Sequence, residues 1–429
     1  YDELLRSEGY SAQVQHLKGV LLQTASNVEA AVKCFQHALE QDADDAFALN
    51  NLGVLAKERG ELTTAVNLYH RARQKRPDLG VTVDNLAIVL TDWGTTAKLQ
   101  GDYDTAARRY EETIAIQPHY SDVRYNYGVL LAEQGRIDEA TRQYEAAIAI
   151  NPNIKEAHCN LGVIHKNCGR LQEAIDCYRA SLRIDKNFDI AASNLSVALT
   201  DLGTVVKLSG DVARAKRLYK EALVTTHTYA EAHYNLGVLY AESGKHDRAI
   251  VSYRMAVTFD PKHHRAWNNL GVLYKDRDDL KSAADCYKRG IAAKPNFAQT
   301  LNNIGVLYTC QGRLDEAMAA LQKALKSEPS YPDALNNLGV LYRDEGQMAL
   351  ALESYERSLK ISPGCNTNAA HNRLLAMNYI RDKSAAAVFD AHRLWGHAFF
   401  AEITGISYAE HARRCRGGGS GGGGGGDDG

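Results

Sequence analysis

A short phrase, Asn-Leu-Gly-Val, recurs along most of the chain and restricts the folds open to it. Five full copies and five looser copies give ten small residues at the third position of the phrase. Successive small residues are 34 positions apart, apart from two steps of 41. A period of this length indicates one supersecondary unit per repeat, which needs its neighbours to bury its apolar face. The ten residues are Gly19, Gly53, Ala87, Gly128, Gly162, Ser196, Gly237, Gly271, Gly305 and Gly339.

Three further positions keep the same period. An alanine follows the small residue by 12 positions, or by 19 in the two long repeats, and an aromatic residue follows four positions later in most copies. Leu321 takes the place of the aromatic residue in one repeat. Seven of the eight prolines lie at the boundary between repeats, where proline cannot continue the preceding helix and suits the start of the next. Each repeat is therefore predicted to hold two helices.

Apolar residues fall at i, i+3, i+4 and i+7 in the first helix of each repeat, which is the stripe of an amphipathic helix. Two packed helices within each period resemble the tetratricopeptide repeat. We predict an all-α fold, a right-handed superhelical solenoid of about ten helical hairpins over residues 12–365. A capping helix region is expected at 366–415. An N-terminal flank covers 1–11, and a glycine-rich tail at 416–429 is expected to be disordered.

The two longer steps come from matching insertions near residues 90–101 and 199–210. The insertions occupy the same place in successive groups of three repeats, which indicates that a three-repeat block was duplicated. Seven extra residues are close to two helical turns, so the first helix can lengthen without losing its phase. The repeats at 80–120 and 189–229 should therefore carry lengthened first helices. The inserted turns are explained by neutral elongation or by a specific docking role.

Composition excludes several function classes. The formal net charge of −2 leaves no overall basic surface for nucleic acid, and the apolar runs are too short to span a bilayer. The eight cysteines form no CxxC pair, which favours a reducing compartment, the nucleus and cytoplasm. His392 and His397 lie five residues apart rather than four, so we expect no metal site and no cofactor. The chain begins with Tyr1 rather than Met and is expected to be a fragment.

An asparagine lies two residues before the small residue in nine of the ten repeats, and Lys18 takes that place in the first. Two residues turn about 200° around a helix, so the side chain should point away from the packing stripe and line the inner surface. A carboxamide can donate to and accept from the amide of an extended peptide. We call these residues the asparagine ladder and predict that they bind peptide. They are Asn51, Asn85, Asn126, Asn160, Asn194, Asn235, Asn269, Asn303 and Asn337.

The alternative for the asparagine ladder is structural. The side chains could bond neighbouring first helices or cap turns, and their recurrence could be inherited through duplication. Asparagine is a poor residue for the middle of a helix, so its presence calls for some role. Both interpretations stay open at the level of sequence.

The period ends after Pro363. The following segment reads as one or two capping helices, and we expect seven of its apolar side chains to face the last repeat. These are Leu374, Leu375, Met377, Tyr379, Phe389, Leu394 and Trp395.

Several stretches resemble SPINDLY-like proteins of the O-linked N-acetylglucosamine transferase family, over about residues 12–396. The stretches are 273–278, 294–299, 372–380 and the Ala-His-Arg-x-Trp-Gly element at 391–396. The resemblance implies a nucleocytoplasmic protein that modifies Ser or Thr of target proteins with fucose or N-acetylglucosamine, and a role in gibberellin signalling through DELLA regulators.

In that family a catalytic domain follows the 391–396 element, whereas this chain diverges near Thr404 and runs into glycine. No catalytic residue can therefore be carried over, and the chain alone is expected to be inactive, with a nucleotide-sugar donor only in a full-length relative. We expect the repeats to recognise acceptor proteins with extended Ser/Thr-containing segments, with a homodimer through the repeats as a further option. The alternative function is a free-standing adaptor without enzymatic role.

Overall fold

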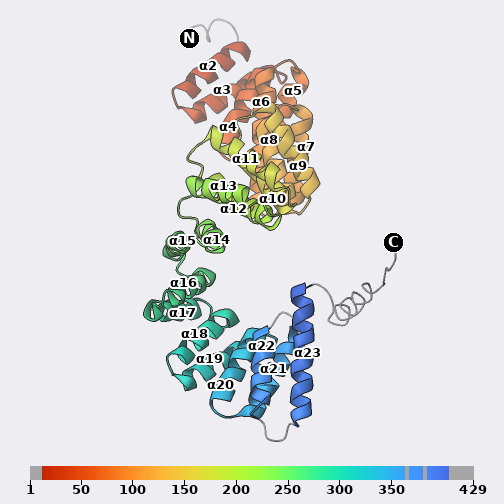
Figure 1. The fold of residues 1–429 in the computed structure, drawn as a ribbon. Helices are drawn as coiled ribbons and strands as arrows, with labels where there is room; N and C mark the ends of the chain where they lie inside the picture. Colours follow the sequence, from red (N-terminus) through yellow and green to blue (C-terminus); the bar gives the residue numbers. More distant parts are fainter. Residues whose placement is uncertain (1–11, 363–366, 380–383, 405–429) are drawn as a thin grey trace, which may run out of the picture. The chain divides into compact units, whose positions relative to one another are not determined.

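The computed structural model describes residues 12–362, 367–379 and 384–404, and within these residues it contains 22 α-helices and no strand (Figure 1). The predicted all-α fold of repeated hairpins is confirmed. The predicted flank at 1–11 and tail at 416–429 lie outside the described residues. The chain forms two compact units, Tyr1–Val205 and Val206–Gly429.

The first unit consists of five helical hairpins and most of a long helix. The hairpins are α2 (Ala12–Thr24) with α3 (Val28–Gln41), α4 (Ala46–Glu58) with α5 (Leu62–Lys75), α6 (Gly80–Leu99) with α7 (Tyr103–Ile116), α8 (Ser121–Glu133) with α9 (Ile137–Ile150), and α10 (Lys155–Asn167) with α11 (Leu171–Ile184), followed by α12 (Asp189–Leu208).

The second unit continues the pattern. It holds α13 (Val212–Thr225), the hairpins α14 (Ala230–Glu242) with α15 (His246–Phe259), α16 (His264–Asp276) with α17 (Leu280–Ala293), α18 (Ala298–Cys310) with α19 (Leu314–Ser327) and α20 (Pro332–Asp344) with α21 (Met348–Ile361), and then α22 (Thr367–Met377) and α23 (Ala385–Thr404).

The turn inside each hairpin passes through the left-handed region of the backbone. Gly244 has φ of 69° at the end of α14, and seven other glycines occupy the same place in other repeats. Glycine adopts this conformation without a Cβ penalty, which ends the first helix and starts the return. Asp278 takes the position after α16 with φ of 63°.

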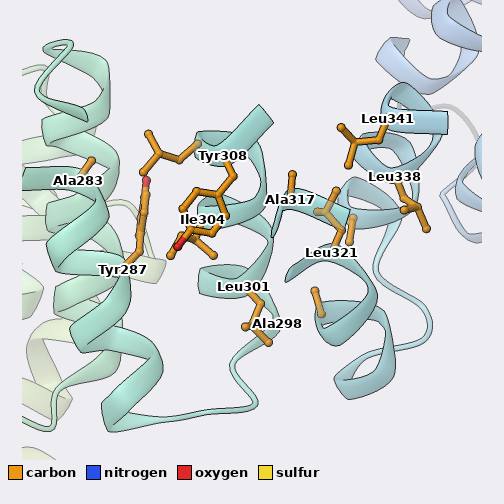
Figure 2. Close-up of a cluster of buried hydrophobic side chains, with 13 residues drawn as sticks. Ala283, Tyr287, Ala298, Leu301, Ile304, Tyr308, Ala317, Leu321, Leu338 and Leu341 are labelled. Atoms are coloured by element: carbon orange, nitrogen blue, oxygen red, sulfur yellow. The ribbon is translucent and has the colours of Figure 1, made fainter. Parts of the chain in front are cut away.

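The small residue of each first helix lets the second helix approach. A Cβ added to Gly271 would lie 2.5 Å from Cε1 of Tyr287, which is fully buried. The repeat that carries Leu321 instead of an aromatic residue places it against Gly305 in the same way. Figure 2 shows this part of the core, where side chains of α17, α18, α19 and α20 fill the space between successive hairpins.

The first long repeat requires a correction. We predicted Ala87 as its small residue, but Gly94 lies at the crossing, where an added Cβ would be 2.7 Å from Cε1 of Tyr110. The inserted turns therefore lie before the crossing point, and the spacing from small residue to tyrosine is the same as elsewhere. Counting from the start of the repeat misplaced the residue by two helical turns.

Both expected long first helices are present. α6 and α12 have 20 residues each, whereas first helices such as α4 and α14 have 13. The two long helices also make equivalent ion pairs with the next first helix. Nζ of Lys98 lies 2.9 Å from Oε1 of Glu133, and Nζ of Lys207 lies 2.7 Å from Oε1 of Glu242.

The last repeat is covered by α22 and α23. Leu374 and Met377 are buried and Trp395 is partly buried against the same cluster, as expected. The inward face of α23 is formed by Val388, Ala391 and Trp395, spaced three and four residues apart. Four of the seven expected contacts are wrong, because Leu375, Tyr379, Phe389 and Leu394 are exposed. Phe389 and Leu394 lie off the inward stripe of α23, and Leu375 lies off the face of α22 that buries Leu374 and Met377.

Candidate functional site

The asparagine ladder lies in the middle of the first helices, and all nine side chains are half-buried. First helices of successive repeats contact one another, for example α16 with α18 and α18 with α20. They form one layer of the array, and the second helices form the other. Within each unit the ladder therefore runs along the layer of first helices.

In three repeats the ladder side chain donates to an asparagine of the preceding repeat. Nδ2 of Asn303 lies 2.9 Å from Oδ1 of Asn268, and the same bond joins Asn337 to Asn302 at 2.9 Å. The bond from Asn85 in the first unit measures 3.1 Å, and its acceptor is Asn50. The donor and acceptor are 35 positions apart in every case. These bonds tie adjacent first helices together.

In three other repeats the ladder side chain finds a different partner. Nδ2 of Asn160 donates to the hydroxyl of Tyr144 at 3.4 Å, and Nδ2 of Asn269 donates to Tyr253 at 3.3 Å. Nδ2 of Asn194 contacts the sulfur of Cys159 at 3.7 Å. In these three repeats the residue 35 positions before the ladder asparagine is not asparagine; it is Tyr125, Tyr234 and Cys159 for Asn160, Asn269 and Asn194, respectively.

Asn126 and Asn235 make no side-chain hydrogen bond with any residue that the structure describes. The residues 35 positions earlier are Thr91 and Thr200, whose hydroxyls donate to the carbonyl oxygens of Ala87 and Ser196 within their own helix. Both ladder positions follow a long first helix, and they are equivalent positions of the two three-repeat blocks.

The sequence prediction missed a second set of asparagines, directly before the ladder, that accept hydrogen bonds from the next repeat. Asn268 is 1% exposed. Its Oδ1 accepts from the hydroxyl of Thr300 at 3.1 Å as well as from Asn303, and its Nδ2 donates to Asn269 at 3.2 Å. Asn50 makes the matching three bonds in the first unit. A recurring signal was present: the pair Asn-Asn at 50–51, 268–269, 302–303 and 336–337.

The two interpretations of the ladder are compatible. A carboxamide has two N–H donors and an oxygen with two lone pairs, so one internal bond leaves part of its capacity unused. An internal bond also fixes the orientation of the group, which lowers the entropy lost when a ligand binds. Six ladder residues have such an internal donor bond, and peptide binding by the ladder remains a prediction.

The tyrosines that pack on the crossing glycines are shielded from water. Burial raises the pKa of Tyr253 to about 12, although the bond from Asn269 acts in the opposite direction. Burial likewise raises the pKa of Tyr355 to about 12. The hydroxyls of Tyr178, Tyr287 and Tyr355 are buried without a hydrogen-bond partner. At each of these three junctions the next repeat's asparagine bonds a side chain of a first helix instead.

Neither a metal-binding cluster nor a membrane helix is found in the part of the chain that the structure describes. No group of three His, Cys, Asp or Glu side chains converges there as metal ligands would. Its helices are too short or too polar to cross a membrane.

Models of the tetratricopeptide repeat match most of the chain. The matched residues are 12–45 and 264–297, 44–119 and 154–223, 97–153, 230–263, and 303–364. No curated protein matches the chain.

Solved structures with similarity to the chain include MamA, at 27% identity and a TM-score of 0.34, covering 38% of this chain and 94% of MamA. YrrB, described as a TPR protein with an unusual peptide-binding site, is 20% identical with a TM-score of 0.36 and coverages of 45% and 96%. The Cut9–Hcn1 structure is 13% identical with a TM-score of 0.42 and coverages of 95% and 96%. The matches to the repeat models, together with the helical hairpins, show that the chain belongs to the tetratricopeptide-repeat proteins.

Proposed function

We propose that the layer of first helices binds extended segments of partner proteins through the asparagine ladder, and that these partners are acceptors of a SPINDLY-like Ser/Thr O-glycosyltransferase of the nucleus and cytoplasm. Arrays of tetratricopeptide repeats are scaffolds that bind proteins. The finer assignment rests on the resemblance of residues 273–278, 294–299, 372–380 and 391–396 to that family. A catalytic domain beyond these repeats would transfer the sugar.

The observation that carries the proposal is the unused hydrogen-bonding capacity of the ladder. Asn126 and Asn235 have no internal side-chain bond to any described residue, and Asn303 and Asn337 each keep one N–H and an oxygen. A mid-helix asparagine without a structural partner is unfavourable relative to alanine. Contacts with a ligand backbone would explain why asparagine stands at both unbonded positions.

Recognition of the backbone can be tested separately from recognition of side chains. The probe is a fluorescent peptide of about a dozen residues, rich in Ser and Thr, measured by anisotropy against the full chain. Two controls carry the same composition, one with a scrambled order and one with alternate backbone amides N-methylated. The scrambled peptide should bind about as well as the probe, whereas N-methylation removes donors and should weaken binding by about tenfold or more. Equal binding of the N-methylated peptide would refute the ladder mechanism.

The assignment to a glycosyltransferase needs a different test. Sequencing the complete transcript should reveal a nucleotide-sugar domain encoded after the repeats. A transcript that ends without such a domain would instead favour the free-standing adaptor, which would bind partners through the same ladder.

A further inference from the structure

The second unit has an apolar groove whose lining includes no ladder asparagine. It runs between α13 and α15 over α14 and has a volume of about 410 Å³. Its walls include Leu223 from α13 and Val251 and Met255 from α15, and Leu236 and Tyr240 of α14 lie at its floor. Val251 and Met255 are 61% and 37% exposed, whereas Leu236 and Tyr240 are buried.

The apolar wall departs from the rest of the array. Val251 and Met255 lie two and six positions after the repeated alanine of the second helix. The other nine repeats have charged or polar residues or alanine at both positions. In α9, the equivalent helix three repeats earlier, the two residues are Arg142 and Ala146. Two exposed aliphatic side chains one helical turn apart therefore occur once at these positions among the ten repeats.

Two cations flank the buried ring at the floor of the groove. Nζ of Lys216 lies 5.0 Å from the ring centroid of Tyr240, and Cζ of Arg248 lies 5.9 Å from it. Neither cation forms an ion pair with a residue that the structure describes. The acidic residue at the rim, Asp247, is already paired with Arg277. The groove thus combines an unpartnered apolar strip with two positive charges that lack a counter-charge among the described residues.

We propose that this groove docks an acidic amphipathic helix of a partner protein. Aliphatic side chains spaced three and four residues apart would cover Val251 and Met255 and enter the groove beside Leu223. Carboxylates beside that apolar face would pair with Lys216 and Arg248, which a neutral or basic helix cannot do. This surface acts independently of the asparagine ladder.

The test uses the full chain and two labelled helical probe peptides of five turns each. Both carry leucine along one face, and they carry either glutamate or lysine beside it. Fluorescence anisotropy should show binding of the glutamate peptide and a loss of affinity as NaCl is added. The lysine peptide should bind at least about tenfold more weakly.

Two variants locate the binding. Val251→Asp with Met255→Asp should lower affinity for the glutamate peptide by about tenfold or more, and Lys216→Ala with Arg248→Ala should do the same without altering the apolar strip. The matched control, Arg142→Asp with Ala146→Asp on α9, should leave affinity unchanged. Circular dichroism melting checks that each variant is folded.

Several results would overturn the proposal. They are failure of the glutamate peptide to bind, equal binding of both peptides, and equal loss in the α9 control. Sedimentation velocity of the chain alone tests whether a second copy of the chain occupies the groove. A dimer abolished by Val251→Asp with Met255→Asp would show that a second copy of the chain fills the groove.

Discussion

The junction between α16 and α18 and the junction between α6 and α8 use the same ladder residue in different ways. At the first, Asn303 donates to a buried Asn268 that also accepts from Thr300. At the second, Asn126 has no hydrogen-bond partner among the described residues, and the hydroxyl of Thr91, 35 positions earlier, donates to Ala87 of its own helix. The same sequence position therefore holds adjacent repeats together in one place and has no internal hydrogen bond to a described residue in another.

Alkaline pH should produce the largest effect, because it acts on many buried tyrosines at once. Burial places the folded pKa of Tyr253 and Tyr355 at about 12, above the value of 10.0 for an exposed tyrosine. Below pH 10 the tyrosine is protonated in both the folded and the unfolded chain. As the pH rises from 10 towards 12 only the unfolded chain loses the proton, so the free energy of unfolding falls by about 1.4 kcal/mol per pH unit for each tyrosine. Urea denaturation at a series of pH values measures this loss. A constant midpoint across this range would contradict the burial argument.

The bonded junction should be sensitive to removal of its buried amide. Asn268→Ala leaves Thr300 and Asn303 without their shared acceptor and should lower the free energy of unfolding by about 2–3 kcal/mol. Asn303→Ala should cost about 1 kcal/mol or less, because Asn268 keeps the bond from Thr300 and alanine is the better helix former. Urea denaturation of both variants measures the two free energies of unfolding. A larger loss for Asn303→Ala than for Asn268→Ala would contradict the prediction.

The buried tyrosines allow a finer comparison between a hydroxyl that accepts a hydrogen bond from the ladder and one that does not. Tyr253→Phe removes the acceptor of Asn269 and should cost about 0.5–1.5 kcal/mol. Tyr287→Phe removes a buried hydroxyl that has no partner and should be neutral or stabilising. Thermal melting of this matched pair is sufficient. Equal destabilisation would mean that the hydroxyl of Tyr287 has a partner, such as a buried water.

The sequence was sufficient to predict the helical hairpins, the two long helices and the place of the ladder asparagines on the first helices, because each depends on periodic positions along one chain. It could not predict the role of Asn268, since a buried acceptor is recognised only once the donor of the next repeat is placed beside it. Gly94 was missed because counting from the repeat start ignores where two helices cross. Phe389 and Leu394 were misplaced because the inward stripe of α23 depends on how that helix docks. The apolar strip of Val251 and Met255 on α15 indicates a docking surface only once the structure places Lys216 and Arg248, which lack ion-pair partners among the described residues, beside it.

We propose that the ladder asparagines without internal partners, Asn126 and Asn235, bind the backbone of a ligand. The most direct test of this claim is the affinity of the Ser/Thr-rich peptide for Asn126→Ala with Asn235→Ala, measured beside the unfolding midpoint. We expect affinity to fall by about five- to a hundredfold while the midpoint is unchanged or slightly raised, because no internal bond is lost. Unchanged affinity in the folded double variant would contradict the claim and leave the ladder with a structural role alone.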